Sequence, residues 1–222
     1  SIYQFALSFC GGKTVLDAGS GCGYGANYMT EKGAVFVTGI DFSQTAVAFS
    51  QQYFRRENLC YQEMDLQNIE GFQPETFDFI FTSNVLEHIE DVPAFLHTAH
   101  KLLKPDGIML VAVPPITNAE SRQANIDNPY HLNIWSPRQW HYVLSQYFEE
   151  IECFRHHIEL PNYDLDFSDT PETSLPVIED FQFLPISIEL LNQIGALTAI
   201  FVVKQKREEK SLPLVNSIPL FF

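Results

Sequence analysis

Short apolar runs alternate with segments of helical period along the first half of the chain. Five of these runs predict strands buried in a sheet: 14–19, 34–41, 59–65, 77–84 and 108–114. The last run is apolar at almost every position, which is typical of a strand that is covered on both faces. Because strands that alternate with helices are joined by right-handed crossovers, the pattern predicts an α/β fold with a mostly parallel sheet.

The helices between these strands have clear beginnings, since Ser43 and Asp91 each precede a periodic segment as N-cap residues do. A chain of 222 residues fits one domain of this kind. We therefore expect a single domain over 1–222, with a short N-terminal helix at 1–12 and a cofactor-binding core at 13–113.

The second half of the chain is less regular. Residues 115–135 predict a polar loop, and Ser136 opens a further helix. Two closing strands are expected at 152–157 and 197–205. Residues 158–194, between them, are rich in Pro, Asp and Glu and have no clear period, so we interpret them as an insertion that covers the functional site.

The run VLDAGSGCGYG at 15–25 carries the strongest chemical signal. It follows a predicted strand and precedes a predicted helix, where glycines let the backbone turn tightly and approach a ligand at the helix N-terminus. Gly21, Gly23 and Ala26 also satisfy the dinucleotide pattern G-x-G-x-x-A. The loop therefore predicts a nucleotide-like cofactor, and a nicotinamide dinucleotide is one candidate.

Asp17 distinguishes between two candidate cofactors. A carboxylate at the end of the first strand repels a pyrophosphate, and burial strengthens the repulsion. S-adenosylmethionine carries a sulfonium and an ammonium and has no phosphate, so the same carboxylate favours it. We therefore expect S-adenosylmethionine, with an NAD-dependent oxidoreductase as the alternative.

Acidic residues also end the next two predicted strands. Asp41 lies at the separation from the glycine loop at which a carboxylate commonly accepts hydrogen bonds from ribose hydroxyls. Met64 and Asp65 follow at the same sheet edge, where a thioether can pack on adenine and a carboxylate can accept from its amino group. Together with Asp17, these positions outline a nucleoside pocket.

With these motifs in place, residues 13–113 resemble the class I S-adenosylmethionine-dependent methyltransferases, and SNVLEHI at 83–89 resembles the loop after strand four in their small-molecule branch. The resemblance implies a Rossmann-like sheet of seven strands, the last antiparallel, with helices on both faces. The cofactor-binding residues that it implies are Asp17, Ala18, Gly19, Ser20, Gly21, Gly23, Asp41, Phe42, Met64, Asp65, Leu66, Ser83 and Asn84. Tyr3 and Phe5 resemble a Tyr-x-Phe segment that closes over the cofactor, although core packing explains them equally well.

Two histidines are candidates for the chemistry of the methyl acceptor. Methyl transfer from a sulfonium needs mainly positioning, but a neutral hydroxyl acceptor must also lose a proton. His88 and His131 could take that proton because imidazole titrates near neutrality. Tyr130 and His131 are expected to contact the acceptor, while pocket shaping by His88 and loop packing by His131 remain open alternatives. We expect no bound metal.

Charge and cysteine content indicate which substrates and which cellular compartment to expect. The chain has 13 Lys and Arg against 28 Asp and Glu, and a net charge of −15 disfavours nucleic acid as a substrate. The four cysteines form no CxxC pair, and no apolar run is long enough to cross a membrane, so we expect a cytoplasmic protein. The sequence thus predicts a methyltransferase for a small-molecule acceptor, while a non-catalytic subunit of the same fold stays possible.

Overall fold

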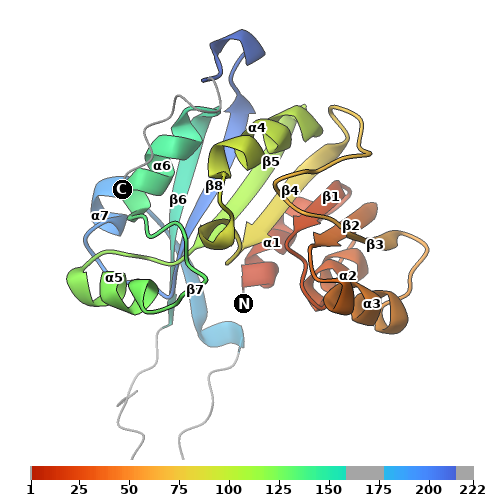
Figure 1. Ribbon diagram of the computed structural model, residues 1–222, viewed down its shortest axis with the longest axis horizontal. Helices are drawn as coiled ribbons and strands as arrows, with labels where there is room; N and C mark the ends of the chain where they lie inside the picture. Colours follow the sequence, from red (N-terminus) through yellow and green to blue (C-terminus); the bar gives the residue numbers. More distant parts are fainter. Residues whose placement is uncertain (1, 159–177, 214–222) are drawn as a thin grey trace, which may run out of the picture.

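The computed structural model describes residues 2–158 and 178–213 of the chain. Within this part, one sheet has eight strands in the order β3-β2-β1-β4-β5-β8-β6-β7 (Figure 1). The strands are β1 (Thr14–Ala18), β2 (Phe36–Asp41), β3 (Leu59–Glu63), β4 (Phe77–Ser83), β5 (Leu103–Val113), β6 (Phe148–Ile158), β7 (Phe181–Ile186) and β8 (Thr198–Lys206). The first five run parallel, whereas β8 is antiparallel to both of its neighbours and β7 is antiparallel to β6.

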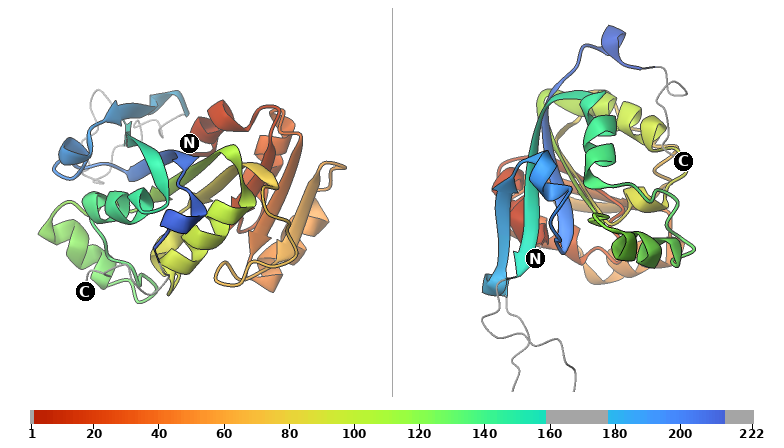
Figure 2. Two further views of the ribbon diagram at one scale, coloured as in Figure 1. Left: turned by 90° about the horizontal axis from the view of Figure 1, so that it is seen from above. Right: turned by 90° about the vertical axis from the view of Figure 1, so that its left-hand side faces the viewer.

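Helices cover both faces of this sheet (Figure 2). They are α1 (Ile2–Cys10), α2 (Tyr24–Glu31), α3 (Gln44–Tyr53), α4 (Val92–Leu102), α5 (Ala119–Ile126), α6 (Pro137–Ser145) and α7 (Ile188–Leu191), with 3-10 helices η1 (Leu86–His88), η2 (Ile178–Asp180) and η3 (Glu209–Ser211). Side chains alternate along β1, so Val15 packs with α1, α2 and α3, and Leu16 packs with α4, α6 and α7 on the other face. Two hydrophobic cores therefore hold the sheet between them.

The predicted helix beginnings are confirmed. The side chains of Ser43 and Asp91 each accept a hydrogen bond from the backbone N–H three residues on, at 3.3 and 2.9 Å. Ser136 forms a capping box with Gln139, and Pro137 is in the first turn of α6. The α/β fold with an antiparallel last strand is confirmed as well.

The sheet has one strand more than the seven expected, because part of 158–194 forms β7. That strand extends the sheet edge beside β6, where Phe183 stacks on His156 with ring centroids 4.9 Å apart. Pro185 makes this strand hard to predict from the sequence, because proline argues against a central strand. An edge strand tolerates proline. No residue of 178–194 lines the pocket described below, so this part does not cover the site; residues 159–177 lie outside the described residues.

The segment 115–135 is not wholly a loop, since it contains α5. This helix buries none of its residues, so it has no apolar stripe that the sequence could reveal. A reciprocal capping box between Asn118 and Ser121 fixes its beginning instead. Across the described ranges, no helix has both the length and the apolar surface that crossing a bilayer requires.

Candidate active site

A pocket of about 650 Å³ opens where β1, β2 and β4 end. The strand order reverses at this point, with β2 on one side of β1 and β4 on the other, and open α/β sheets bind ligands at such a crevice. The pocket is lined by Gly19, Gly21, Asp41, Phe42, Asp65, Leu66, Gln67, Ser83, Asn84, Val85, His88, Ile89 and Tyr130. Among the described residues, no lysine or arginine belongs to this lining.

One side of the pocket, which we call the glycine wall, consists of residues 19–23 with Asp41 and Phe42. The backbone N–H groups of Gly19 and Ser20 both donate to the carbonyl of Ile40 at 2.9 Å, which fastens the loop to β2. Gly21 has a φ of +52° and open space where a side chain would begin, so the backbone there faces the pocket unobstructed.

Asp41 organises this wall. One of its carboxylate oxygens accepts from the N–H of Gly21 at 2.8 Å and the other from the N–H of Ser43 at 2.9 Å. A carboxylate has about four acceptor positions, so Asp41 can still accept hydrogen bonds from a ligand hydroxyl. Its position on the pocket lining suits the ribose contact that the sequence predicts.

Asp17 lies behind the glycine wall and does not line the pocket. Its side chain is fully buried, and the hydroxyl of Tyr3 donates to it at 3.2 Å. Burial raises the pKa of Asp17 to about 7, although the hydrogen bond from Tyr3 opposes the change. The ring of Tyr3 packs where a side chain on Gly25 would have to be, so Gly25 leaves room for this contact.

The other predicted cofactor residues divide into two groups. Phe42, Asp65, Leu66, Ser83 and Asn84 line the pocket beside the glycines and Asp41. The predicted residues that do not line it, besides Asp17, are Ala18, Ser20, Gly23 and Met64.

Packing explains two of these positions. A side chain on Gly23 would collide with Ser50 and Tyr61, so this glycine lets the loop pack against α3 and β3. Met64 packs against the hydrophobic core instead.

Three lining residues were not predicted, namely Gln67, Val85 and Ile89. Val85 and Ile89 belong to the SNVLEHI run, whose position after β4 was the signal that could have included them. Val85 also packs so close to Gly19 that a side chain at that glycine would collide with it. Gln67 follows Asp65 in an irregular loop and has no such signal.

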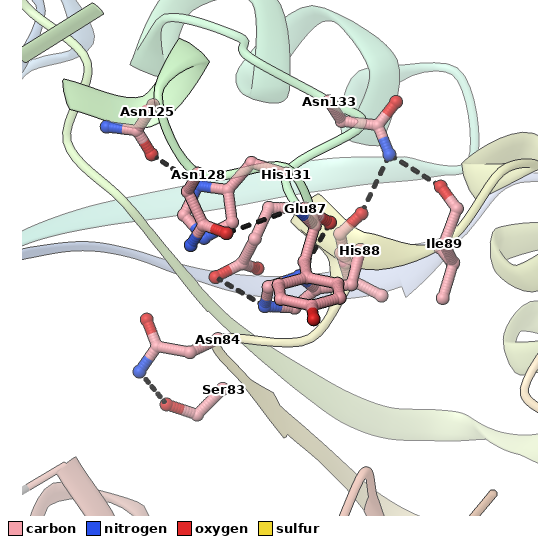
Figure 3. A network of polar contacts seen from close by, with 11 residues as sticks. Ser83, Asn84, Glu87, His88, Ile89, Asn125, Asn128, His131 and Asn133 are labelled. Atoms are coloured by element: carbon pink, nitrogen blue, oxygen red, sulfur yellow. Dashed lines mark hydrogen bonds and ion pairs between the residues drawn. The ribbon is translucent and has the colours of Figure 1, made fainter. Parts of the chain in front are cut away.

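A second part of the lining comes from what we call the histidine wall, residues 83–89 and 125–133 (Figure 3). The two segments are joined by hydrogen bonds to buried backbone groups. The side chain of Asn133 donates to the carbonyls of Leu86 and Ile89 at 2.9 and 2.7 Å, and the backbone N–H groups of Leu132 and Asn133 donate to the carbonyl of Glu87. These bonds bring the loop after α5 next to η1.

This joint places His88 beside His131, with ring centroids 4.8 Å apart. Nδ1 of His88 lies 2.9 Å from the carbonyl oxygen of Tyr130, and Nδ1 of His131 lies 2.6 Å from the side-chain oxygen of Asn125. His88 lines the pocket, whereas His131 does not. Burial, followed by the neighbouring His88, lowers the pKa of His131, so its imidazole is neutral near pH 7.

Glu87 is the third titratable side chain of the histidine wall beside the two histidines. Its side chain is buried, and Oε2 has no hydrogen-bond partner among the described residues. Burial raises the pKa of Glu87 to about 7. Ligand atoms of Glu87, His88 and His131 lie within 4.8 Å of one another, a grouping that the sequence analysis did not foresee.

Comparison with known proteins shows which families and folds the chain is similar to. Residues 16–111 match the family model of the methyltransferase domain. The chain is 36% identical over 137 residues to a ubiquinone biosynthesis O-methyltransferase of Rhodopseudomonas palustris, covering 61% of this chain and 53% of that protein. It is 36% identical over 104 residues to phosphoethanolamine N-methyltransferase 1 of Arabidopsis thaliana, covering 46% and 21%.

A solved S-adenosylmethionine-dependent methyltransferase from Mesorhizobium loti has the same fold, with a TM-score of 0.61 and 18% identity over 93% of this chain and 96% of that one. Residues 16–111 thus match the methyltransferase domain, and the described residues share the fold of this solved methyltransferase. The match agrees with the predicted class at the level of this domain, and the cofactor stays a prediction. The chain spans about half the length, or less, of the curated relatives that it matches.

Proposed function

We propose that this protein transfers a methyl group from S-adenosylmethionine to an oxygen or nitrogen atom of a small-molecule acceptor. The observation that carries the proposal is the lining of the pocket, which combines exposed glycine backbone with the carboxylates of Asp41 and Asp65 and contains no lysine or arginine. A dinucleotide would bring a pyrophosphate next to these carboxylates, whereas a cationic nucleoside without phosphate is attracted to them.

The residues present fit this cofactor. Asp41 has acceptor capacity left for the ribose, and Asp65 can accept from an amino group of the adenine. Phe42, Leu66 and Ile89 give the pocket apolar surface for the base. When bound, S-adenosylmethionine supplies a methyl group already activated by a sulfonium.

We assign the acceptor to the histidine wall. His88 and Tyr130 line the pocket there, and His131 stands behind them. A hydroxyl acceptor must lose a proton as it attacks, and a neutral imidazole can accept it. The lowered pKa of His131 keeps that imidazole unprotonated near pH 7, which suits this role.

The volume of the pocket and the net charge of the protein restrict which acceptors can bind. A volume of about 650 Å³ lies within the range of ordinary small-molecule pockets, and cofactor and acceptor must share it. The net charge of −15 disfavours a polyanionic substrate. A cytoplasmic location belongs to the same proposal, supported by four free cysteines.

The proposal is tested by incubating the purified protein with S-adenosylmethionine labelled in its methyl group and a panel of acceptors. The panel should contain catechol-like phenols, small primary amines and an RNA control. We expect label in a phenol or an amine and none in the RNA. Stoichiometric S-adenosylmethionine binding without transfer to any acceptor or cell extract would favour a non-catalytic subunit instead.

A further inference from the structure

Three groups with free lone pairs converge beside the pocket, from Glu87, His88 and His131 (Figure 3). Nε2 of His88 is 3.9 Å from Oε1 of Glu87, and one ligand atom of each residue lies within 4.8 Å of the other two. In the described ranges, no other histidine, cysteine or carboxylate group forms a comparable set of three.

The hydrogen bonds of the two rings determine which nitrogen is free. Nδ1 of His88 faces a backbone carbonyl, which can only accept, so the proton of the neutral ring is on Nδ1. Nδ1 of His131 faces the amide of Asn125, whose nitrogen donates to the carbonyl of Ser121 and whose oxygen therefore faces the ring. Both rings thus keep a lone pair on Nε2, and histidines that bind metals are held in this way.

Glu87 provides an independent indication. Its side chain is 2% exposed, and Oε2 has no hydrogen-bond partner in the part of the chain that the structure describes. A buried carboxylate without a partner is costly, and a cation beside it removes that cost. Among the described residues, Glu87 has no ion pair with a lysine or arginine, and two imidazoles lie beside it, so an ion bound by all three side chains is the partner that fits.

We propose that Glu87, His88 and His131 bind one divalent transition-metal ion, with zinc as the representative case. Two imidazoles and one carboxylate suit borderline ions of this kind, whereas magnesium and calcium prefer sets of oxygen ligands. Ligands of a tetrahedral zinc ion stand about 3.3 Å apart. Separations of up to 4.8 Å must therefore shrink by up to about 1.5 Å when the three side chains close on the ion.

The fourth position of such an ion faces the pocket, because His88 is part of the lining. An ion there would lower the pKa of an acceptor hydroxyl next to it, and the two histidines would then act as ligands and not as bases. This role rests on the proposed function, but the binding of the metal does not.

The test uses protein without an affinity tag, stripped with a chelator and then dialysed against zinc, with bound metal measured by elemental analysis. We expect one zinc per chain. His88→Gln and His131→Gln should each weaken zinc binding by at least about tenfold, since loss of an outer partner alone weakens metal sites by about 10–100-fold. Asn125→Ala, which removes the hydrogen-bond partner of His131, should weaken it about tenfold. His157→Gln, the same substitution outside the group, should leave it unchanged.

Glu87→Gln tests the carboxylate, and its circular dichroism shows whether the variant folds. Cobalt provides a second readout, since its visible absorption in the native protein should disappear in the two histidine variants. Failure of the native protein to hold stoichiometric zinc would overturn the inference, as would equal binding by the native protein and both histidine variants. Calorimetry with S-adenosylmethionine on the same samples separates the claims: binding without zinc contradicts this inference alone, and zinc without S-adenosylmethionine contradicts the proposed function alone.

Discussion

The two walls of the pocket are built in different ways. The glycine wall uses backbone geometry, with left-handed conformations at Gly19 and Gly21 and a single carboxylate, Asp41, that accepts from the loop. The histidine wall uses long-range hydrogen bonds, such as those of Asn133 to carbonyls 44 and 47 residues earlier in the chain. The glycine wall therefore depends on a local motif, whereas the histidine wall depends on contacts between segments that are far apart in the sequence.

Two buried carboxylates, Asp17 and Glu87, also differ in their hydrogen bonds. Asp17 accepts a hydrogen bond from Tyr3, whereas one oxygen of Glu87 has no hydrogen-bond partner among the described residues. The first group is complete within the fold. The metal ion proposed above would supply the partner that this oxygen of Glu87 lacks.

Asp17→Asn should produce the largest effect, on the pH dependence of stability. The pKa of Asp17 is raised in the folded protein, so its contribution is fully present below about pH 4 and is lost as pH rises through about 7. The gap between 3.8 and about 7 corresponds to at most about 4 kcal/mol. Urea denaturation from pH 5 to pH 8 should show a flatter profile for the variant, while Asp106→Asn on the surface should follow the native profile. Parallel curves for Asp17→Asn and the native protein would mean that the buried carboxyl does not titrate in this range.

Asn133→Ala should destabilise the histidine wall by about 2–4 kcal/mol, because two buried carbonyls lose their donor. The matched change outside the histidine wall is Asn58→Ala. It removes one hydrogen bond to the carbonyl of Ala34 and should cost about 1 kcal/mol. Equal losses in the free energy of unfolding would contradict the special importance of Asn133 for the histidine wall.

Asp41→Ala should reduce the affinity for S-adenosylmethionine by about 1.5–3 kcal/mol, the usual effect of removing hydrogen bonds to a charged acceptor. Isothermal calorimetry measures the change, and Asp106→Ala is the surface control. Zinc binding by Asp41→Ala should stay native, because Asp41 belongs to the other wall. Unchanged affinity for the cofactor would show that Asp41 does not contact it.

Gly21→Ala and Gly12→Ala form a matched pair with the smallest expected effects. Both glycines have positive φ and open space beside them, so each substitution should cost about 1 kcal/mol of stability. Only Gly21 lines the pocket, and only Gly21→Ala should weaken cofactor binding, by several-fold. Equal cofactor affinities for the two variants would show that the loop does not approach the ligand.

The sequence predicts the glycine wall well because its signals are local. The glycine loop, the caps at Ser43 and Asp91 and the acidic strand ends each depend on a few neighbouring residues. The exception is Asp17, whose position at the strand end was predicted but whose burial beneath Tyr3 depends on a helix packed from elsewhere.

The histidine wall could be predicted only in part. His88, Tyr130 and His131 were candidates from residue type, but their meeting depends on Asn133 and on α5, which has no apolar stripe. Strand β7 was missed for a related reason, since its aromatic residues pack on β6 and α1 in a segment that is otherwise rich in proline and acidic residues.

The most direct test of the pocket is calorimetric titration of the native protein with S-adenosylmethionine and, separately, with NAD⁺. A pocket lined by carboxylates and free of lysine and arginine should bind one S-adenosylmethionine per chain and show no heat of binding with NAD⁺. Binding of NAD⁺, or of neither compound, would contradict the assignment of this crevice to a cationic nucleoside.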